Sequence, residues 1–305
     1  MSDVAVLAHI ERAEALAAAK QLIEWLERNG HSVVLPPGEA AVLGRTELSD
    51  DDQLVNGRAA LAVSIGGDGT MLRSFDMVAA AGVPVLGVNV GHLGYLTEFE
   101  PPHLIETVAA ALAGDLGISE RMMVSANVRR AGDRGAGRRA GESDAARGAG
   151  DGTDEVSMWT GLNEVVVEKR DPGHTIRLEV SFDGDVFATY AADGLIVSTP
   201  TGSTAYSLSA GGAVVAPTHE ALQVTPVAPH MLFDRSLLLP AETEIGLRVI
   251  GERTALAAVD GRSATRLHTG DELIVTRAPY QARLVTAGAD SFHRVLKHKF
   301  GLKDR

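Results

Sequence analysis

The chain has 305 residues, about the length of two typical domains, and can bury a hydrophobic core without disulfides or metals. Its 45% hydrophobic and 22% charged residues are typical of a soluble globular protein and exclude wholesale disorder. A net charge of −12 would repel a phosphate backbone, so no nucleic-acid partner is expected. Because there is no cysteine, disulfides, thiolate zinc sites and cysteine nucleophiles are excluded.

The sequence gives no sign of a membrane segment or an export signal. No apolar run approaches the roughly 18 residues of a membrane span. The N-terminus carries early acidic residues instead of a basic stretch followed by an apolar one. We therefore expect a cytoplasmic protein with no membrane partner.

The first 120 residues alternate short apolar runs with helical patterns. Strands are predicted at 4–8, 32–35, 61–65 and 85–88, and helices at 11–29 and 70–81. A polar loop around 49–52 separates the second and third strands. Alternating strands and helices predict a mostly parallel sheet covered on both faces, with ligands at the carboxyl ends of its strands.

The pattern changes to short β-branched segments beyond residue 120. Asp183-Gly184 and Asp260-Gly261 are candidate tight-hairpin dipeptides. We expect an α/β domain at 1–120 and a β-rich domain at 121–289. Strands of the second domain are predicted at 122–128, 162–168, 175–182, 186–190, 195–198, 245–250, 256–259, 272–276 and 282–285.

Two further segments stand apart from these domains. Residues 131–154 are rich in Gly, Ala, Arg and acids, with few large apolar residues, which predicts a mobile loop. Residues 290–300 begin with Asp-Ser and then show helical spacing, so we expect 290–305 to form a helix that packs back on the first domain.

The strongest local signal follows the third predicted strand. Gly66-Gly67-Asp68-Gly69-Thr70 joins this strand to a helix, where free N–H groups and the helix dipole favour anionic oxygens such as phosphate. A strained turn in which Asp68 only caps the helix is the simpler alternative. An acid beside a phosphate is costly unless it handles a proton or a cation, and this favours function.

Other familiar signatures are absent. The chain has no G-x-x-x-x-G-K-[ST] and no G-x-G-x-x-G motif. It also has no H-E-x-x-H and no G-x-S-x-G motif, so we expect no protein-bound metal and no hydrolase triad.

Three later segments place polar groups at strand ends. Asn163-Glu164 can read an adenine edge or ribose hydroxyls, although a polar edge pair is equally consistent with it. Asp193-Gly194 precedes a strand and can be a simple turn. Residues 199–212 hold more small hydroxyl side chains than a linker needs, which favours binding over a capped turn.

Taken together, these motifs resemble those of bacterial NAD kinases, the family that phosphorylates NAD on its adenosine ribose to give NADP. The resemblance covers nearly the whole chain, and the T-P-T-G-S-T-A-Y stretch at 199–206 makes it specific. It implies a Rossmann-like α/β N-terminal domain plus a β-rich C-terminal domain, with NAD between them. It also implies a homodimer or homotetramer built largely through the second domain.

The resemblance implies roles for individual residues. Asp68 would be the catalytic proton acceptor. Asn163 and Glu164 would contact the adenosine, and Asp193 the other end of the dinucleotide. The remaining implied binding residues are Gly66, Gly67, Gly69, Thr70, Arg73, His174, Thr204, Ala205, Tyr206, Ser209 and Arg262.

The expected reaction is transfer of the γ-phosphoryl group of ATP to the 2′-hydroxyl of the adenosine ribose. Mg²⁺ would arrive with the nucleotide, and polyphosphate is an alternative donor. Two other interpretations are a lipid or sugar kinase that shares only the glycine-aspartate loop, and a non-catalytic NAD(P)-binding sensor. The stretch at 199–209 argues against the first, and an acid at position 68 argues against the second.

Overall fold

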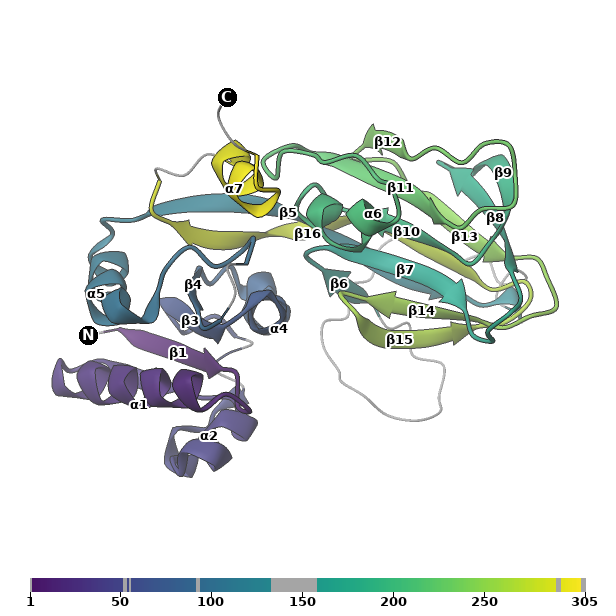
Figure 1. Ribbon diagram of the computed structural model, residues 1–305. Coiled ribbons are helices and arrows are strands. Elements are labelled where there is room, and N and C mark those ends of the chain that lie inside the picture. The colour runs from purple at the N-terminus through teal and green to yellow at the C-terminus, as the bar shows by residue number, and fades with distance from the viewer. Residues whose placement is uncertain are drawn as a thin grey trace. The chain divides into compact units, whose positions relative to one another are not determined.

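The computed structural model describes residues 2–51, 54, 56–91, 94–132, 158–288 and 292–302 (Figure 1). The chain divides into two compact units. Unit 1 comprises Met1–Met123, Val214–Glu220 and Ala278–Arg305, and unit 2 comprises Val124–Ala213 and Ala221–Arg277. Two long strands, β5 (Gly117–Arg129) and β16 (Glu272–Thr286), have residues in both units.

Unit 1 is built on the parallel sheet that the sequence predicts. Its strands are β1 (Asp3–Ala8), β2 (Ser32–Val34), β3 (Leu61–Gly66) and β4 (Val85–Asn89), in the order β2-β1-β3-β4. All three pairings are parallel. Leu284, near the end of β16, adds a further parallel pairing with Val85.

Helices cover both faces of this sheet, as predicted. α1 (Ala13–Arg28) and α5 (Leu104–Ala113) contribute to the core that buries Val4, Val6 and Ile65. α4 (Asp68–Val78) covers the opposite face, where the Met71 sulfur lies close to Gly87. Further helical segments described in unit 1 are α2 (Pro37–Leu43), η1 (Thr46–Leu48), η2 (Ala79–Ala81), η3 (Pro101–His103) and α7 (Phe292–Lys299).

Unit 2 contains two antiparallel arrangements of strands. One pairs β16 with β13 (Ile245–Val249), then β8 (Ile176–Phe182) and β9 (Asp185–Ala192). The other has the order β12-β11-β10-β7-β14-β15. Its strands are β7 (Glu164–Lys169), β10 (Gly194–Ser198), β11 (Ala221–Val227), β12 (Leu237–Pro240), β14 (Ala255–Val259) and β15 (Arg262–Leu267).

Both predicted tight hairpins are confirmed. Asp183 and Gly184, with φ of 51° and 87°, join β8 to β9. Asp260 and Gly261, with φ of 47° and 75°, join β14 to β15. Positive φ at two successive residues is the conformation that Asp-Gly hairpins adopt most readily.

Other sequence predictions were incomplete or wrong. The strands predicted at 272–276 and 282–285 are one continuous strand, β16, because the Ala-Pro between them does not break it. Helices α2 and α5 and strands β11, β12 and β15 were not predicted. The loop at 131–154 lies outside the described residues beyond Gly132, as does the expected Asp-Ser helix cap near 290.

No helix in the described part of the chain is both long enough and apolar enough to cross a bilayer.

Candidate active site

The glycine-aspartate loop lies where the sequence predicts it, between the end of β3 and the start of α4. Gly67 immediately precedes the helix and Asp68 is its first residue. The carbonyl of Gly67 accepts hydrogen bonds from the N–H groups of Thr70 and Met71, closing the first turn. A Cβ at Gly66 would lie 2.2 Å from the Thr70 hydroxyl oxygen, so only glycine fits this close approach.

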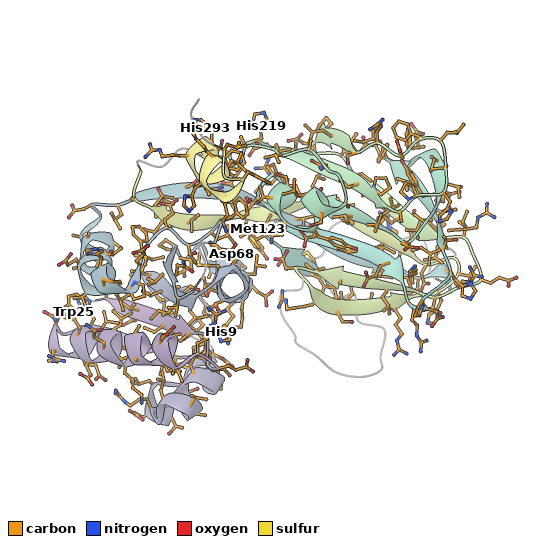
Figure 2. The ribbon with its side chains drawn as sticks, in the orientation of Figure 1. His9, Trp25, Asp68, Met123, His219 and His293 are labelled. Atoms are coloured by element: carbon orange, nitrogen blue, oxygen red, sulfur yellow. The ribbon has the colours of Figure 1, made fainter. Side chains whose placement is uncertain are left out.

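A turn from another part of unit 1 holds the carboxylate of Asp68 (labelled in Figure 2). Its Oδ2 accepts a hydrogen bond from the Tyr95 N–H at 2.9 Å, and its Oδ1 accepts one from the Leu96 N–H at 3.1 Å. A Cβ at Gly94 would lie only 2.0 Å from Oδ1. The side chain of Asp68 is therefore fixed at both oxygens, and each oxygen keeps a lone pair for a further partner.

This loop borders a cavity of about 500 Å³ at the carboxyl ends of β1 and β3. The cavity wall combines backbone at the start of α4 with cationic side chains, which suits an anionic ligand. Of the residues predicted from the loop motif, Gly67, Asp68, Gly69, Thr70 and Arg73 line it. The other lining residues are Ala8, His9, Ile10, Glu11 and Arg12.

In unit 2, Asp260 anchors the segment that contains Asn163 and Glu164. Its Oδ2 accepts a hydrogen bond from the Leu162 N–H at 2.7 Å. Its Oδ1 accepts bonds from the N–H groups of Asn163 and Glu164, at 2.8 and 3.1 Å. The Asp260 side chain thus fixes the backbone that presents the predicted adenosine-contacting pair.

The stretch at 199–209 is tied to the same segment. Thr199 donates from its hydroxyl to the Leu162 carbonyl at 2.5 Å, and its N–H donates to the Asn163 carbonyl at 2.8 Å. A Cβ at Gly202 would lie 2.1 Å from the Asn163 carbonyl oxygen, so glycine is required there. The stretch then forms η5 (Thr201–Thr204) and α6 (Tyr206–Ser209). Of the four predicted residues of this region, Thr204 ends η5, Ala205 joins the two segments, and Tyr206 and Ser209 begin and end α6.

Glu164 is the most perturbed acid in this cluster. Its side chain is buried, and its Oε2 has no hydrogen-bond partner among the described residues. Burial raises the pKa of Glu164 to about 7, and the nearby carboxylate of Asp260 adds to the effect. A buried carboxyl with an unused oxygen is chemically suited to meet a ligand hydroxyl or amine.

Asp193 and Tyr206 complete the cluster. The Asp193 carboxylate pairs with the Lys169 ammonium at 2.7 Å. Burial, together with the negative charges of Glu168, Asp193 and Glu164, raises the pKa of Tyr206. The phenol thus lies within electrostatic reach of the predicted binding acids.

The structure does not join every predicted residue to this cluster. His174 is exposed in the turn that precedes β8. Arg262 is exposed at the start of β15, and its charge acts on Asp260. No sequence pattern indicated the Gly94–Leu96 turn, the anchoring role of Asp260 or the ion pair of Lys169. Only Asp260 had been noticed, as a hairpin residue.

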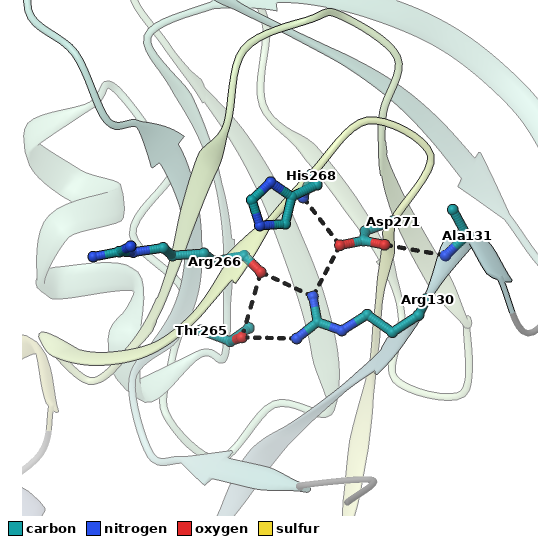
Figure 3. Close-up of polar contacts among 6 residues, drawn as sticks. All are labelled: Arg130, Ala131, Thr265, Arg266, His268 and Asp271. Atoms are coloured by element: carbon teal, nitrogen blue, oxygen red, sulfur yellow. Dashed lines mark hydrogen bonds and ion pairs between the residues drawn. The ribbon is translucent and has the colours of Figure 1, made fainter. Parts of the chain in front are cut away.

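A larger cavity, of about 760 Å³, lies elsewhere in unit 2 and contains none of the predicted residues (Figure 3). Its Arg130 guanidinium pairs with Asp271 at 2.9 Å and donates to the Thr265 hydroxyl. Burial would raise the pKa of Asp271, but backbone N–H bonds from His268 and Ala131 and the Arg130 pair hold it below its usual value. Arg130 and Asp271 already pair with each other, and volume alone does not make this cavity the candidate site.

Among the described residues, no group of three His, Asp or Glu side chains is placed to hold a metal ion.

Comparisons with known proteins match two separate segments of the chain to the two domains of one protein family. The sequence profile of the ATP-NAD kinase N-terminal domain matches residues 4–116, and that of the ATP-NAD kinase C-terminal domain matches residues 162–287. The NAD kinase of Symbiobacterium thermophilum is 38% identical over 300 residues, covering 98% of this chain and 99% of that protein. The NAD kinase of Citrifermentans bemidjiense is 34% identical over 309 residues, with full coverage of both chains.

Solved structures show the same fold. A yeast NADH kinase in complex with NADH superposes with a TM-score of 0.84 at 23% identity, covering 100% of this chain and 89% of that one. An NAD kinase from Archaeoglobus fulgidus in complex with ATP gives 0.71 at 23% identity, with both chains fully covered. Since the two profiles account for most of the chain and the sequence relatives align along its full length, this protein belongs to the NAD kinase family.

Proposed function

We propose that this protein is an NAD kinase that transfers the γ-phosphoryl group of ATP to the 2′-hydroxyl of the adenosine ribose of NAD. Full-length relatives that carry the name NAD kinase, at 33–38% identity, support this activity. The observation that carries the proposal within the structure is the fixed carboxylate of Asp68, on the wall of a cavity whose backbone and cations suit phosphate.

Asp68 acts as the proton acceptor in this proposal. One carboxylate oxygen of Asp68 accepts the proton of the ribose 2′-hydroxyl. The hydroxyl oxygen attacks the γ-phosphorus of ATP, and ADP leaves. Phosphoryl transfer passes through a loose transition state, so positioning and charge stabilisation supply most of the rate enhancement. The N–H groups at the start of α4 and the Arg73 guanidinium would supply the stabilisation.

Mg²⁺ enters this proposal as part of the ATP substrate. The described residues offer no three-ligand metal cluster, and Mg²⁺ commonly takes its ligands from substrate phosphates and water. Inorganic polyphosphate presents similar oxygens and is the alternative donor to test.

In unit 2, we assign the binding of the dinucleotide to the residues around the 162–164 segment that Asp260 anchors. Asn163 and Glu164 would bind the adenosine, and Asp193 the far end of the NAD. The backbone and hydroxyls of 204–209 would line the same ligand, with His174 and Arg262 at its margin. Support comes from the unused, buried Oε2 of Glu164 and from the polar groups gathered around Tyr206.

The proposal also includes domain limits at 1–120 and 121–289, a cytoplasmic location and a homodimer or homotetramer. Exposed apolar side chains on the edge strand β9, Val186 and Phe187, support an interface between copies in unit 2. Light scattering of the purified protein measures the number of copies.

A coupled assay for NADP formation tests the activity. The protein is incubated with ATP or polyphosphate, with and without Mg²⁺, and with NAD, diacylglycerol or fructose 6-phosphate as acceptor. NAD alone should gain phosphate. Binding of NAD in calorimetry with no NADP formed from any donor would instead identify a sensor, and transfer to another acceptor would identify a different kinase.

Asp68→Asn tests the assignment of the base. Turnover should fall about 10²–10⁴-fold, the usual worth of a positioned general base. Because an amide nitrogen cannot accept a hydrogen bond, this variant also loses one of the bonds from Tyr95 or Leu96. NAD affinity measured by calorimetry should stay within a few-fold, and unchanged turnover would remove the base assignment.

A further inference from the structure

Glu39, on α2, is a charged side chain that the proposed reaction does not use, although it is fully buried. Its Oε1 accepts a hydrogen bond from the Ala8 N–H, at the end of β1, at 3.3 Å. Burying a carboxylate is costly unless it is paired and hydrogen-bonded. The partner of this carboxylate therefore identifies its role.

That partner is Arg73, which lines the cavity beside Asp68. The two side chains meet as a fork: Arg73 Nη1 donates to Oε2 at 3.3 Å, and Arg73 Nη2 donates to Oε1. Nη2 also donates to the Ala8 carbonyl at 3.1 Å. One edge of the guanidinium is thus fixed by the protein.

The Arg73 guanidinium keeps two N–H groups, one on Nε and one on Nη1, that can meet a ligand. A guanidinium has five N–H groups, and these three bonds leave the remaining two without a partner among the described residues. The Arg73 side chain is 39% exposed, whereas Glu39 is fully buried. A long, flexible arginine is thereby held in one orientation at the cavity wall before any ligand arrives.

We infer that Glu39 is a positioning residue that orients Arg73 to bind phosphate groups in the cavity. This inference rests on the proposed function, and the phosphates belong either to the triphosphate of ATP or to the pyrophosphate of NAD. A preoriented guanidinium offers a phosphate its positive charge and its remaining N–H donors in a fixed position, and a mobile one loses part of that affinity to side-chain entropy. Glu39 touches no ligand itself and acts only through Arg73.

The competing explanation is that Glu39 only ties α2 to β1 and stabilises the fold. The two explanations differ in what Glu39→Gln changes. If Glu39 positions Arg73, the KM for one nucleotide rises about tenfold or more, the usual worth of a charged hydrogen bond, while the KM for the other stays within about threefold. If Glu39 is only structural, the melting temperature falls and both KM values of the folded enzyme are unchanged.

The matched control is Glu47→Gln. Glu47 pairs with Arg45 at 2.5 Å in the same part of unit 1, but it is exposed and does not line the cavity. This variant removes the same charge and should leave both KM values unchanged. Separate titrations of ATP and of NAD then show which ligand supplies the phosphates.

A binding measurement keeps the test independent of turnover. Inorganic tripolyphosphate and pyrophosphate are titrated into wild type, Glu39→Gln and Glu47→Gln by calorimetry. Glu39→Gln should lower the affinity for the polyanion about tenfold or more, and Glu47→Gln should leave that affinity unchanged. If the wild-type protein binds polyanion but forms no NADP, the proposed function is wrong. The polyanion titration still decides the role of Glu39 in that case.

A double-mutant cycle with Arg73→Ala completes the experiment. In that background, Glu39→Gln should cause no further loss of nucleotide or polyanion affinity, because Arg73 is no longer there to be positioned. It should also recover stability, because Arg73→Ala leaves a fully buried carboxylate without its partner. Independent, additive losses of affinity would overturn the inference, as would equal polyanion affinity of Glu39→Gln and wild type.

Discussion

Glu164→Gln should remove a loss of stability that the wild-type protein undergoes as pH rises from about 4.5 to about 7. Burial, followed by the negative charge of Asp260, raises the pKa of Glu164 from 4.5 to about 7, against a smaller opposing effect of a hydrogen bond with the Tyr206 backbone. A carboxyl whose pKa rises on folding binds its proton more tightly in the folded state. The free energy of unfolding therefore falls as pH rises from about 4.5 to about 7, and is level above that range.

The magnitude follows from the shift. One pKa unit corresponds to about 1.4 kcal/mol, so the full cost of ionising Glu164 is about 3 kcal/mol. At pH 5 the same carboxyl in the unfolded chain is already mostly ionised, so the change left between pH 5 and pH 8.5 is roughly 2–3 kcal/mol. Glutamine has no proton to lose, so Glu164→Gln removes this dependence and keeps nearly the same shape.

Thermal unfolding without ligand, followed by circular dichroism from pH 5 to pH 8.5, measures the effect. The melting temperature of Glu164→Gln should rise relative to wild type by about 5–10 °C across this range, from the usual conversion for a domain of this size. Glu168→Gln, on the same strand but only partly buried, is the control and should follow the wild-type profile. Parallel profiles for Glu164→Gln and wild type would refute the burial argument.

Two glycine substitutions test the close contacts that build the site. Gly94→Ala places a Cβ 2.0 Å from the Asp68 carboxylate, so kcat should fall roughly a hundredfold while circular dichroism shows a folded protein; an unchanged kcat would mean that the turn does not set the position of Asp68. Gly202→Ala forces a Cβ against the Asn163 carbonyl, and denaturant titration should show a loss of about 1–3 kcal/mol with weaker NAD binding. Gly38→Ala is the control for both, since a Cβ there meets nothing within 4 Å, and it should raise stability by about 0.5–1 kcal/mol.

The fold was predictable from the sequence where the local pattern agreed with the tertiary structure. The parallel strands of unit 1 are continuous apolar runs bounded by turn residues, so these strands and helices α1 and α4 followed from the pattern, whereas the order of the strands in the sheet did not. β15 was missed because polar residues interrupt its apolar pattern, and β12 because it is a run of only four residues that ends in proline. The break expected within β16 was wrong because Ala278-Pro279 resembles a turn, whereas the strand continues through it.

α2 and Glu39 show a different limit. The sequence Pro37-Gly38-Glu39 reads as a turn, and an isolated glutamate on a short helix gives no sign of burial. Only the tertiary structure shows that this carboxylate is fully buried, because its partner Arg73 lies 34 positions further along the chain. Partnerships over such separations leave no local pattern for sequence reasoning to detect.

For the same reason, the contacts that fix the carboxylates of Asp68 and Asp260 could not be predicted from the sequence. Asp68 accepts main-chain hydrogen bonds from Tyr95 and Leu96, and Asp260 accepts them from the 162–164 segment nearly a hundred residues away in sequence. Main-chain N–H donors are present at every residue except proline, so the donating residues carry no side-chain signature. What remains visible in the sequence is the acid itself and the glycines that allow its close approach, such as Gly66 and Gly94. For that reason the sequence pointed to the carboxylate that we propose as the proton acceptor, but only the structure reveals what holds it in position.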